Sequence, residues 1–331
     1  MIELPYTEKQ FDEKLVAVTN KGEVQIVGKL FGDQKAKDRK SKIEAGYKYI
    51  IRTYSPTNTE GKEYIVDLGG KFIEQIFIRT RPDNGNVVIA GMYSNEHNNS
   101  LFRASGVLHG FFYLEIAPDG KVANKYIKDL NASKIKNISA ELLNEKQNGL
   151  SPNVDVIDVF FKKDGSLIVV TEDSYFTQTT SPNSGRTRTT YHNNDNIIIC
   201  LDPKGDIKWT VSVPKKQIGR ESKVALGASA IFKDDNLFLI YNDSAANLEK
   251  EPDGRPKGLG LFGKSVVTLA LVSPDGKLTR KALATTKEIE GFIFAPLLSE
   301  RLTDDELVFV SVRLGLVGVS KYKLARIKIG A

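Results

Sequence analysis

Short apolar runs recur along the chain, and residues that favour turns separate them. The clearest example is 111–130, where the apolar run Phe111–Ile116 is followed by Pro118-Asp119-Gly120 and then by alternating polar and apolar residues. Proline presets φ for a turn and glycine accepts positive φ, so this segment predicts a β-hairpin. Similar hairpins are predicted for Tyr49 to Leu68 around Ser55-Pro56 and Gly61-Lys62, for Ile197 to Val213 around Pro203-Lys204-Gly205, and for Val266 to Leu283 around Pro274-Asp275-Gly276.

A second type of hairpin precedes each of these and also begins a last, incomplete copy. Its turns lie at Gly22, Gly85, Gly165, Asp235 and Asp305, roughly 60 to 80 residues apart. Two hairpins per repeat make four strands, and a repeat of this size is typical of propeller blades.

The inner strands are apolar on both faces, which favours sheets that lie between neighbouring sheets. We therefore predict an all-β fold, a β-propeller of about five four-stranded blades forming a single domain over residues 1–331. A sandwich or a two-domain β protein is the alternative. Pairing of Ile2-Glu3-Leu4 with the last strand, Tyr322 to Ile329, would close the ring and remove the exposed edges. The predicted blades are 13–68, 74–130, 155–213, 227–285, and 292–329 together with 2–5.

The Asp-Gly and Pro-Asp-Gly hairpins resemble those of β-propeller proteins in general. The Leu4-Pro5-Tyr6 start and the run Gly22-Glu23-Val24-Gln25-Ile26-Val27 more narrowly resemble uncharacterised exported propellers common in Bacteroidetes, as does 85–91. The resemblance implies a periplasmic or cell-surface protein whose signal peptide has been removed. It implies no catalytic residues.

Composition changes this picture little. Hydrophobic residues make up 40% and charged residues 27% of the 331, as in ordinary globular proteins. No apolar run is long enough to span a bilayer as a helix. A single cysteine, Cys200, excludes internal disulfides, and the net charge of +6 permits anionic partners without requiring them.

Loop length gives the main functional indication. In four of the predicted blades, the link from the second strand to the third is long. These links are Leu30 to Tyr47, Ser94 to Gly110, Glu172 to Asn196, and Asn242 to Gly263. Because strand direction alternates within a blade, all of them are expected on one face of the propeller. Long loops on a rigid scaffold concentrate binding residues, although they are also tolerated as simple insertions. A short helix over 140–147, with Ser139 as N-cap, is predicted in a connector on the same face. The binding candidates are His97, Phe102, Arg103, Arg186, Arg188, Tyr191 and Phe262.

Four carboxylates form a second group of candidates. Glu13, Glu74, Asp158 and Glu290 fall at or just before the innermost strand of four predicted blades, near the mouth of a central channel. Converging there, they would suit a hard cation such as Ca²⁺, or serve as acid and base in a hydrolase. The alternative is that each is solvated or paired with a lysine or arginine.

Two segments match motifs for phosphate or nucleic-acid binding, but their surroundings in the sequence argue against both functions. Gly258–Ser265 matches the phosphate-binding P-loop pattern, but the residues after it predict a strand where that loop requires a helix. Ser184–His192 is basic but lacks an aromatic platform, so a solvated loop is favoured over a nucleic-acid site.

The sequence thus predicts a non-enzymatic binding or scaffold propeller. We expect a protein or envelope-glycan partner, with no cofactor, nucleotide, nucleic acid or transmembrane segment. The alternatives are a hydrolase or lactonase with a metal ion in the channel, and a structural subunit of a cell-envelope assembly.

Overall fold

The computed structural model describes residues 4–19, 22–31, 47–81, 83–96, 107–250, 255–314 and 319–329. The chain divides into two compact units, which are described separately here. Unit 1 comprises residues 1–131 and 146–152, and unit 2 comprises 132–145 and 153–331.

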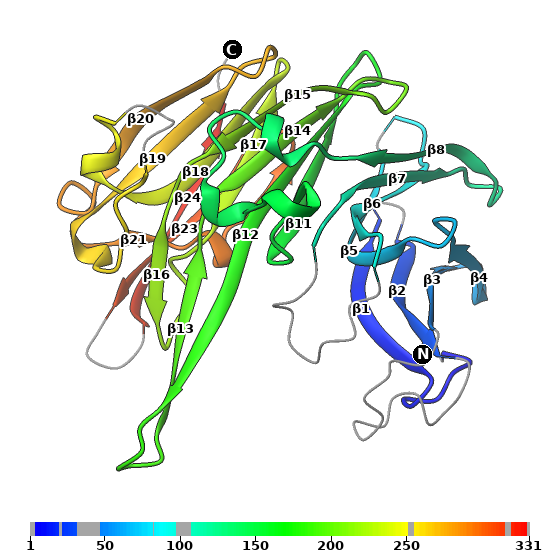
Figure 1. Cartoon of the computed structure of the whole chain (residues 1–331), viewed down its shortest axis with the longest axis horizontal. Coiled ribbons are helices and arrows are strands. Elements are labelled where there is room, and N and C mark those ends of the chain that lie inside the picture. The colour runs from blue at the N-terminus through cyan, green and yellow to red at the C-terminus, as the bar shows by residue number, and fades with distance from the viewer. Residues whose placement is uncertain are drawn as a thin grey trace. The chain divides into compact units, whose positions relative to one another are not determined.

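Unit 1 contains two four-stranded antiparallel sheets in which each strand pairs with the next along the chain (Figure 1). Their strands are β1 (Phe11–Val18), β2 (Val24–Phe31), β3 (Tyr47–Ser55) and β4 (Asn58–Val66), then β5 (Phe72–Thr80), β6 (Val87–Ser94), β7 (Gly110–Ile116) and β8 (Val122–Asp129).

The two sheets of unit 1 share one hydrophobic cluster. Val27 and Ile51 of the first sheet are buried in the same cluster as Ile89, Phe112 and Leu114 of the second. The residues of β6 and β7 are almost all buried, whereas β4 and β8 are largely exposed outer strands. This gradient from buried inner strands to a wet outer strand is expected when sheets pack face to face.

Unit 2 contains three further antiparallel sheets. The first pairs β11 (Val154–Phe161) with β12 (Leu167–Thr180), β12 with β14 (Asn196–Leu201), and β14 with β15 (Ile207–Val213). The second orders β17 (Ala228–Lys233), β18 (Asn236–Ser244), β19 (Ser265–Val272) and β20 (Leu278–Thr285), and the third contains β21 (Ile293–Phe294), β22 (Glu300–Thr303), β23 (Glu306–Leu314) and β24 (Val319–Lys328).

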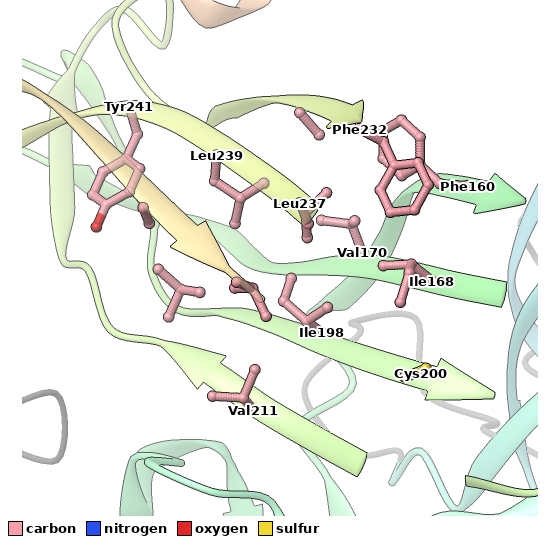
Figure 2. Packing of buried hydrophobic residues seen from close by; sticks show 14 residues of the cluster. Phe160, Ile168, Val170, Ile198, Cys200, Val211, Phe232, Leu237, Leu239 and Tyr241 are labelled. Atoms are coloured by element: carbon pink, nitrogen blue, oxygen red, sulfur yellow. The ribbon is translucent and has the colours of Figure 1, made fainter. Parts of the chain in front are cut away.

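The middle sheet of unit 2 is buried on both faces. On one face Leu237, Leu239 and Tyr241 pack against Ile168 and Ile198 of the preceding sheet (Figure 2). On the other, alternate residues such as Ile231 and Ile240 pack against Phe294 and Leu307 of the following sheet. A sheet enclosed on both faces by its neighbours is packed as a propeller blade is, which is why its strands are continuous apolar runs.

The predicted hairpins are confirmed in both units. Glycines with positive φ lie in the turns at Gly22, Gly85, Gly120 and Gly165. One turn is shifted, however: β3 and β4 are joined at Pro56-Thr57, and Gly61 lies inside β4. A Cβ on Gly61 would come within 2.7 Å of the Tyr54 ring, so this glycine permits a close contact within the sheet.

Two predictions about the connecting segments are wrong. The predicted helix over 140–147 is replaced by short 3₁₀ turns, η4 (Ala140–Leu142) and η5 (Glu145–Gln147), around the strand β9 (Leu143–Asn144). Ser139 has the extended backbone usual for an N-cap but makes no side-chain hydrogen bond as one, and only a single turn follows it. The other short elements in the connectors are η3 (Ala132–Lys134), β10 (Gly149–Leu150), η6 (Ala245–Asn247), η7 (Phe262–Lys264) and η8 (Pro296–Leu298).

The predicted loop from Glu172 to Asn196 is a β-hairpin. β12 continues to Thr180 and pairs with β13 (Thr187–Asn193), which in turn pairs with β16 (Gln217–Arg220). We call the projecting part, residues 175–192, the arm; Figure 1 shows β12 and β13 extending beyond their sheet. Threonine-rich strands have high β propensity, and β16 supplies backbone partners to the base of the arm.

Residues 2 and 3, which the sequence predicts to close the last sheet, lie outside the described residues. Among the described residues, no helix is long and apolar enough to cross a membrane.

Candidate functional site

The polar residues of unit 2 gather where β12 and β14 leave their sheet. Glu172 and Asp173 lie in β12 just before the arm, and Asn194-Asp195 immediately precede β14. Backbone hydrogen bonds fix the two segments against each other, from Asp173 N to Asp195 O at 3.0 Å and from Asn194 N to Asp173 O at 2.8 Å. The strand ends therefore hold these side chains on rigid backbone.

A cavity of about 270 Å³ opens over this junction. Its walls come from the η4 connector, the strand ends, the β15–β16 link and the link after β18, all within unit 2. The lining residues are Asn137, Ile138, Ser139, Ala140, Glu141, Asp173, Asn194, Asp195, Pro214, Lys215, Lys216, Arg255 and Pro256.

Two buried carboxylates form part of this lining. Asp195 is only 2% exposed; its Oδ1 accepts the Lys215 backbone N–H at 3.1 Å, and the Ser212 hydroxyl lies 3.4 Å from Oδ2. Asp173 is 5% exposed, and its Oδ2 accepts the Asn194 side-chain amide at 2.8 Å. Among the described residues, Asp173 Oδ1 has no hydrogen-bond partner, so this buried residue keeps an acceptor available at the cavity.

A buried lysine lies behind these carboxylates. Lys215 is fully buried, and its Nζ lies 2.8 Å from Glu172 Oε1 and donates to the Asn194 carbonyl. Glu172 Oε2 also accepts the Asn193 side-chain amide at 2.6 Å. The ammonium group is therefore engaged with Glu172 and the backbone. Three buried carboxylates, Glu172, Asp173 and Asp195, share one buried cation.

Burial shifts the acidity of the two cavity carboxylates. Loss of hydration raises the pKa of Asp195 to about 6, although the Lys215 N–H, the Lys215 charge and the Ser139 hydroxyl oppose the shift. Burial also raises the pKa of Asp173, against the Asn194 amide and Lys215. Like charges disfavour ionisation, so Glu172 and Glu141 also raise the pKa of Asp173, and Asp173 raises the pKa of Asp195.

Aromatic side chains at the base of the arm adjoin the cavity. Tyr175 and His192 face each other across β12 and β13 with ring centroids 4.5 Å apart and nearly parallel planes. The pKa of Tyr175 is raised by burial and by Asp173, and the pKa of His192 is lowered by burial and by the Lys216 charge. Both rings thus lie close to residues of the cavity wall.

The predicted loop candidates have different positions. Arg186 and Arg188 are exposed on the outer part of the arm, and Tyr191 packs at its base against the cluster that contains Leu226 and Leu259. Phe262 was predicted to face a ligand, but it is 9% exposed and belongs to the same cluster, where it closes a core under the loops. His97, Phe102 and Arg103 lie outside the described residues.

The four predicted channel carboxylates have separate environments. Asp158 lies 3.0 Å from Arg301, and the exposed Glu290 lies 2.7 Å from Lys323. Glu13 is exposed on β1, and Glu74 lies at a register shift in β5. Among the described residues, no group of three or more His, Cys, Asp or Glu side chains is arranged to hold a metal ion.

A second cavity, of about 450 Å³, lies in unit 1 along Tyr49, Asp67, Lys71 and Phe72. Lys71 Nζ there donates to Asn95 Oδ1 at 2.8 Å. In contrast to the cavity of unit 2, its wall contains no buried carboxylate.

The sequence pointed to two links that contribute to the unit 2 cavity, 172–196 and 242–263, but not to the residues that form the site. A signal was present in Asn193-Asn194-Asp195-Asn196, four consecutive polar residues that lead into the apolar strand β14 and include its first residue. Polar residues at the carboxyl or amino ends of buried strands are positions where a site can be held rigidly. Lys215 gave no such signal, since its neighbours Pro214 and Lys216 suggest an ordinary surface link.

Comparison with known proteins adds a fold-level likeness only. No protein-family model matches the chain, and no curated protein has a similar sequence. Among solved structures, it is similar to an acylaminoacyl peptidase from Pyrococcus horikoshii, with 10% identity, a TM-score of 0.41, and coverage of 92% of this chain but 36% of that one. The chain thus spans little more than a third of that protein.

Two further structures are similar over much of their length. A protein of unknown function from Bacteroides caccae has 13% identity and a TM-score of 0.27, with 84% of this chain and 82% of that chain covered. The WD40 domain of SCAP from fission yeast has 11% identity and a TM-score of 0.32, with 100% and 73% covered. Because the sequence identities and TM-scores are this low, the function of the site is inferred only from this chain's own residues.

Proposed function

We propose that this protein is a non-enzymatic binding protein whose ligand site is the cavity of unit 2. One observation carries the proposal: Asp173 is almost fully buried at the cavity wall and keeps one carboxylate oxygen without a partner among the described residues. This oxygen is open to the cavity, since it is not one of the unpartnered atoms that are closed off from water. A ligand that donates to it would replace the water that it contacts there.

The proposal includes the arrangement of the whole chain. We infer that the sheets are blades of one β-propeller of about five blades, with residues 2–5 completing the last. The face-to-face packing within each unit supports this inference. Its loop face would then carry the cavity, because the η4 connector and the links after β12, β15 and β18 all contribute to the wall.

The resemblance to exported propellers supports a location in the periplasm or on the cell surface. A protein partner or an envelope glycan would be the source of the ligand there. Fractionation of the source cell with an antibody against the protein tests this location, and recovery in the cytoplasmic fraction alone would contradict it.

Blocking the cavity tests the ligand site. Ala140 is exposed and lines the cavity, so Ala140→Phe fills the space without disturbing a core. Ala282→Phe adds the same ring to an exposed position of β20 and is the matched control. Both variants are incubated with a small-molecule and glycan extract of the source cell, separated from unbound material and analysed by mass spectrometry. We expect a ligand on the wild type and on Ala282→Phe that is lost from Ala140→Phe.

A second candidate is a hydrolase that uses Asp195 as a general acid. The observation in its favour is the pKa of about 6, which keeps a fraction of the carboxyl protonated near neutral pH. The same extract distinguishes the two functions. A binding protein returns its ligand unchanged, whereas a hydrolase depletes a compound and yields products over time.

A further inference from the structure

We propose that the group recognised in the unit 2 cavity is a protonated primary amine, held by Asp173 and Asp195. The inference rests on the proposed binding function and adds the chemical class of the ligand. It is drawn from the charge balance and from the acceptors at the cavity wall.

The buried charges at the cavity are negative in sum, while Glu141, Lys216 and Arg255 line its more exposed part. Glu172, Asp173 and Asp195 are 6%, 5% and 2% exposed, and Lys215 is the cation buried with them. The Lys215 ammonium lies against Glu172, so its charge is largely matched by that carboxylate. Asp173 and Asp195 are then left at the wall with little compensation. An organic cation would supply it, because buried charges are stable when they are paired and hydrogen-bonded.

The buried end of the wall presents an acceptor to the cavity. The Lys215 N–H is bonded to Asp195, and the Asn194 amide N–H is bonded to Asp173. Among the described residues, Asp173 Oδ1 has no hydrogen-bond partner and is open to the cavity, whereas the unpartnered Asn194 Oδ1 is closed off from it. An ammonium group has three donors and no acceptor, so it matches this end of the cavity. A carboxylate or phosphate placed here would meet an acceptor and negative charge, because the lining cations Lys216 and Arg255 lie in the more exposed part of the wall.

The rest of the ligand would face the more exposed part of the wall. Glu141 and Lys216 lie there as a loose ion pair 3.8 Å apart, and Arg255 is exposed. Mixed polar groups of this kind suit hydroxyl or carbonyl groups. An amino sugar and the amino terminus of a short peptide share the required chemistry, and the experiment separates these two sources.

Matched probes test the amine directly. Glucosamine is compared with glucose and N-acetylglucosamine, and the peptide glycylglycine amide with its N-acetylated form, by titration calorimetry at pH 7. We expect at least one free amine to bind tenfold or more tightly than its neutral partners. Asp173→Asn should weaken that binding at least tenfold, since it removes the charge and keeps the shape. Asp305→Asn, in the β22–β23 turn and outside the cavity lining, should leave it unchanged.

The pH dependence adds an independent readout. Asp195 is faced by Asp173 from β12, by Lys215 from the β15–β16 link and by Ser139 from the η4 connector, with Glu172, Glu141 and Lys216 nearby. Binding of a cation requires the ionised form, so affinity should fall about tenfold from pH 7 to pH 5. It should also release protons, seen as a buffer-dependent heat.

The outcomes separate the two proposals. If the neutral probes bind as tightly as the amines and Ala140→Phe blocks both, the amine inference is wrong and the binding site stands. If neither amine binds, the amine inference is also wrong, and the extract experiment decides the site. If an amine binds regardless of Asp173→Asn and Ala140→Phe, the site itself is wrong. Trp209 fluorescence confirms that each variant is folded.

Discussion

Asp195 shows how burial turns an ordinary residue into a titrating group near neutral pH. It is held by a backbone N–H and nearby hydroxyls, yet these donors do not replace the lost hydration, so its pKa rises to about 6. The folded state therefore binds a proton more tightly than the unfolded state does. The contribution of protonated Asp195 to the free energy of unfolding is therefore present below pH 4 and is lost as the pH rises through about 6.

We predict that Asp195→Asn becomes more stabilising, relative to the wild type, as the pH rises. The asparagine keeps an acceptor for the Lys215 N–H and cannot ionise. The advantage should grow by about 3 kcal/mol between pH 4 and pH 8. Urea unfolding followed by Trp209 fluorescence measures it, because this tryptophan is the only one and lies in unit 2.

Asp305→Asn is the control for this experiment. Asp305 is half-buried in a turn, and the Thr303 hydroxyl holds its pKa below the usual range. This variant should gain nothing at high pH. A pH-independent difference between Asp195→Asn and wild type would contradict the raised pKa of Asp195.

Lys215 is the residue on which the other buried charges depend. Replacing it with methionine leaves Glu172, Asp173 and Asp195 without their buried cation. We predict a loss of about 3–5 kcal/mol of unfolding free energy at pH 7, measured by urea unfolding. Adding Glu172→Gln should restore part of this loss, because one buried charge is removed.

Lys323→Met serves as the comparison for the lysine substitution. It breaks the exposed pair with Glu290, and exposed pairs contribute about 1 kcal/mol or less. Equal losses in the two lysine variants would show that Lys215 does not compensate buried charge.

At the residue scale, the sequence could not identify this site. Asp173 and Lys215 are 42 positions apart and come together only because β12 and β15 lie on either side of β14 in one sheet. The predicted candidates Arg186 and Arg188 were chosen for charge, and charge alone favours exposed positions. Phe262 was chosen for its ring, and a ring in a loop is equally suited to closing a small core.

At the scale of elements, turns were predictable and long links were not. Gly85, Gly120 and Gly165 require positive φ, and this local demand fixes the hairpins. The arm depends instead on pairing with β16, some thirty residues away along the chain, so no local pattern marked it as a strand. The helix over 140–147 failed for a related reason, since tertiary contacts of the connector outweigh weak propensity in so short a segment.

The arm should be removable without loss of the cavity. Thr177 and Thr190 are paired across β12 and β13, so residues 178–189 can be replaced by Asn-Gly, which forms a tight two-residue hairpin. Most of the deleted side chains are exposed. We predict that urea unfolding of unit 2, followed by Trp209 fluorescence, changes by less than about 1 kcal/mol.

A wider deletion provides the contrast. Removing 172–196 would also delete Glu172, Asp173 and Asp195 together with part of β12, and should prevent folding of unit 2. If the shorter deletion is equally damaging, the arm contributes to the core and is not an appendage.

At the scale of the whole molecule, the repeat predicted how sheets pack but not how the chain is closed. β18 and β19 are buried because each face of their sheet meets another sheet, as the continuous apolar runs indicated. The proposed closure would depend instead on two segments at opposite ends of the sequence. β24 carries exposed Tyr322 and Leu324, at 61% and 73%, and pairs with β23 along one edge.

Hydrogen exchange of β24 tests the proposed closure. In an antiparallel strand every second N–H points to each side, so pairing with β23 alone protects about half of the amides. If residues 2–5 add a strand to the other edge, the remaining amides near Leu324 and Arg326 should also be protected in the full chain.

Deleting residues 1–5 should expose that second set and leave the set bonded to β23 largely protected. β20, which pairs with β19, should be unaffected and is the internal control. A second set that exchanges rapidly in the full chain would show that β24 is a free edge, and the ring would then not be closed by the N-terminal segment.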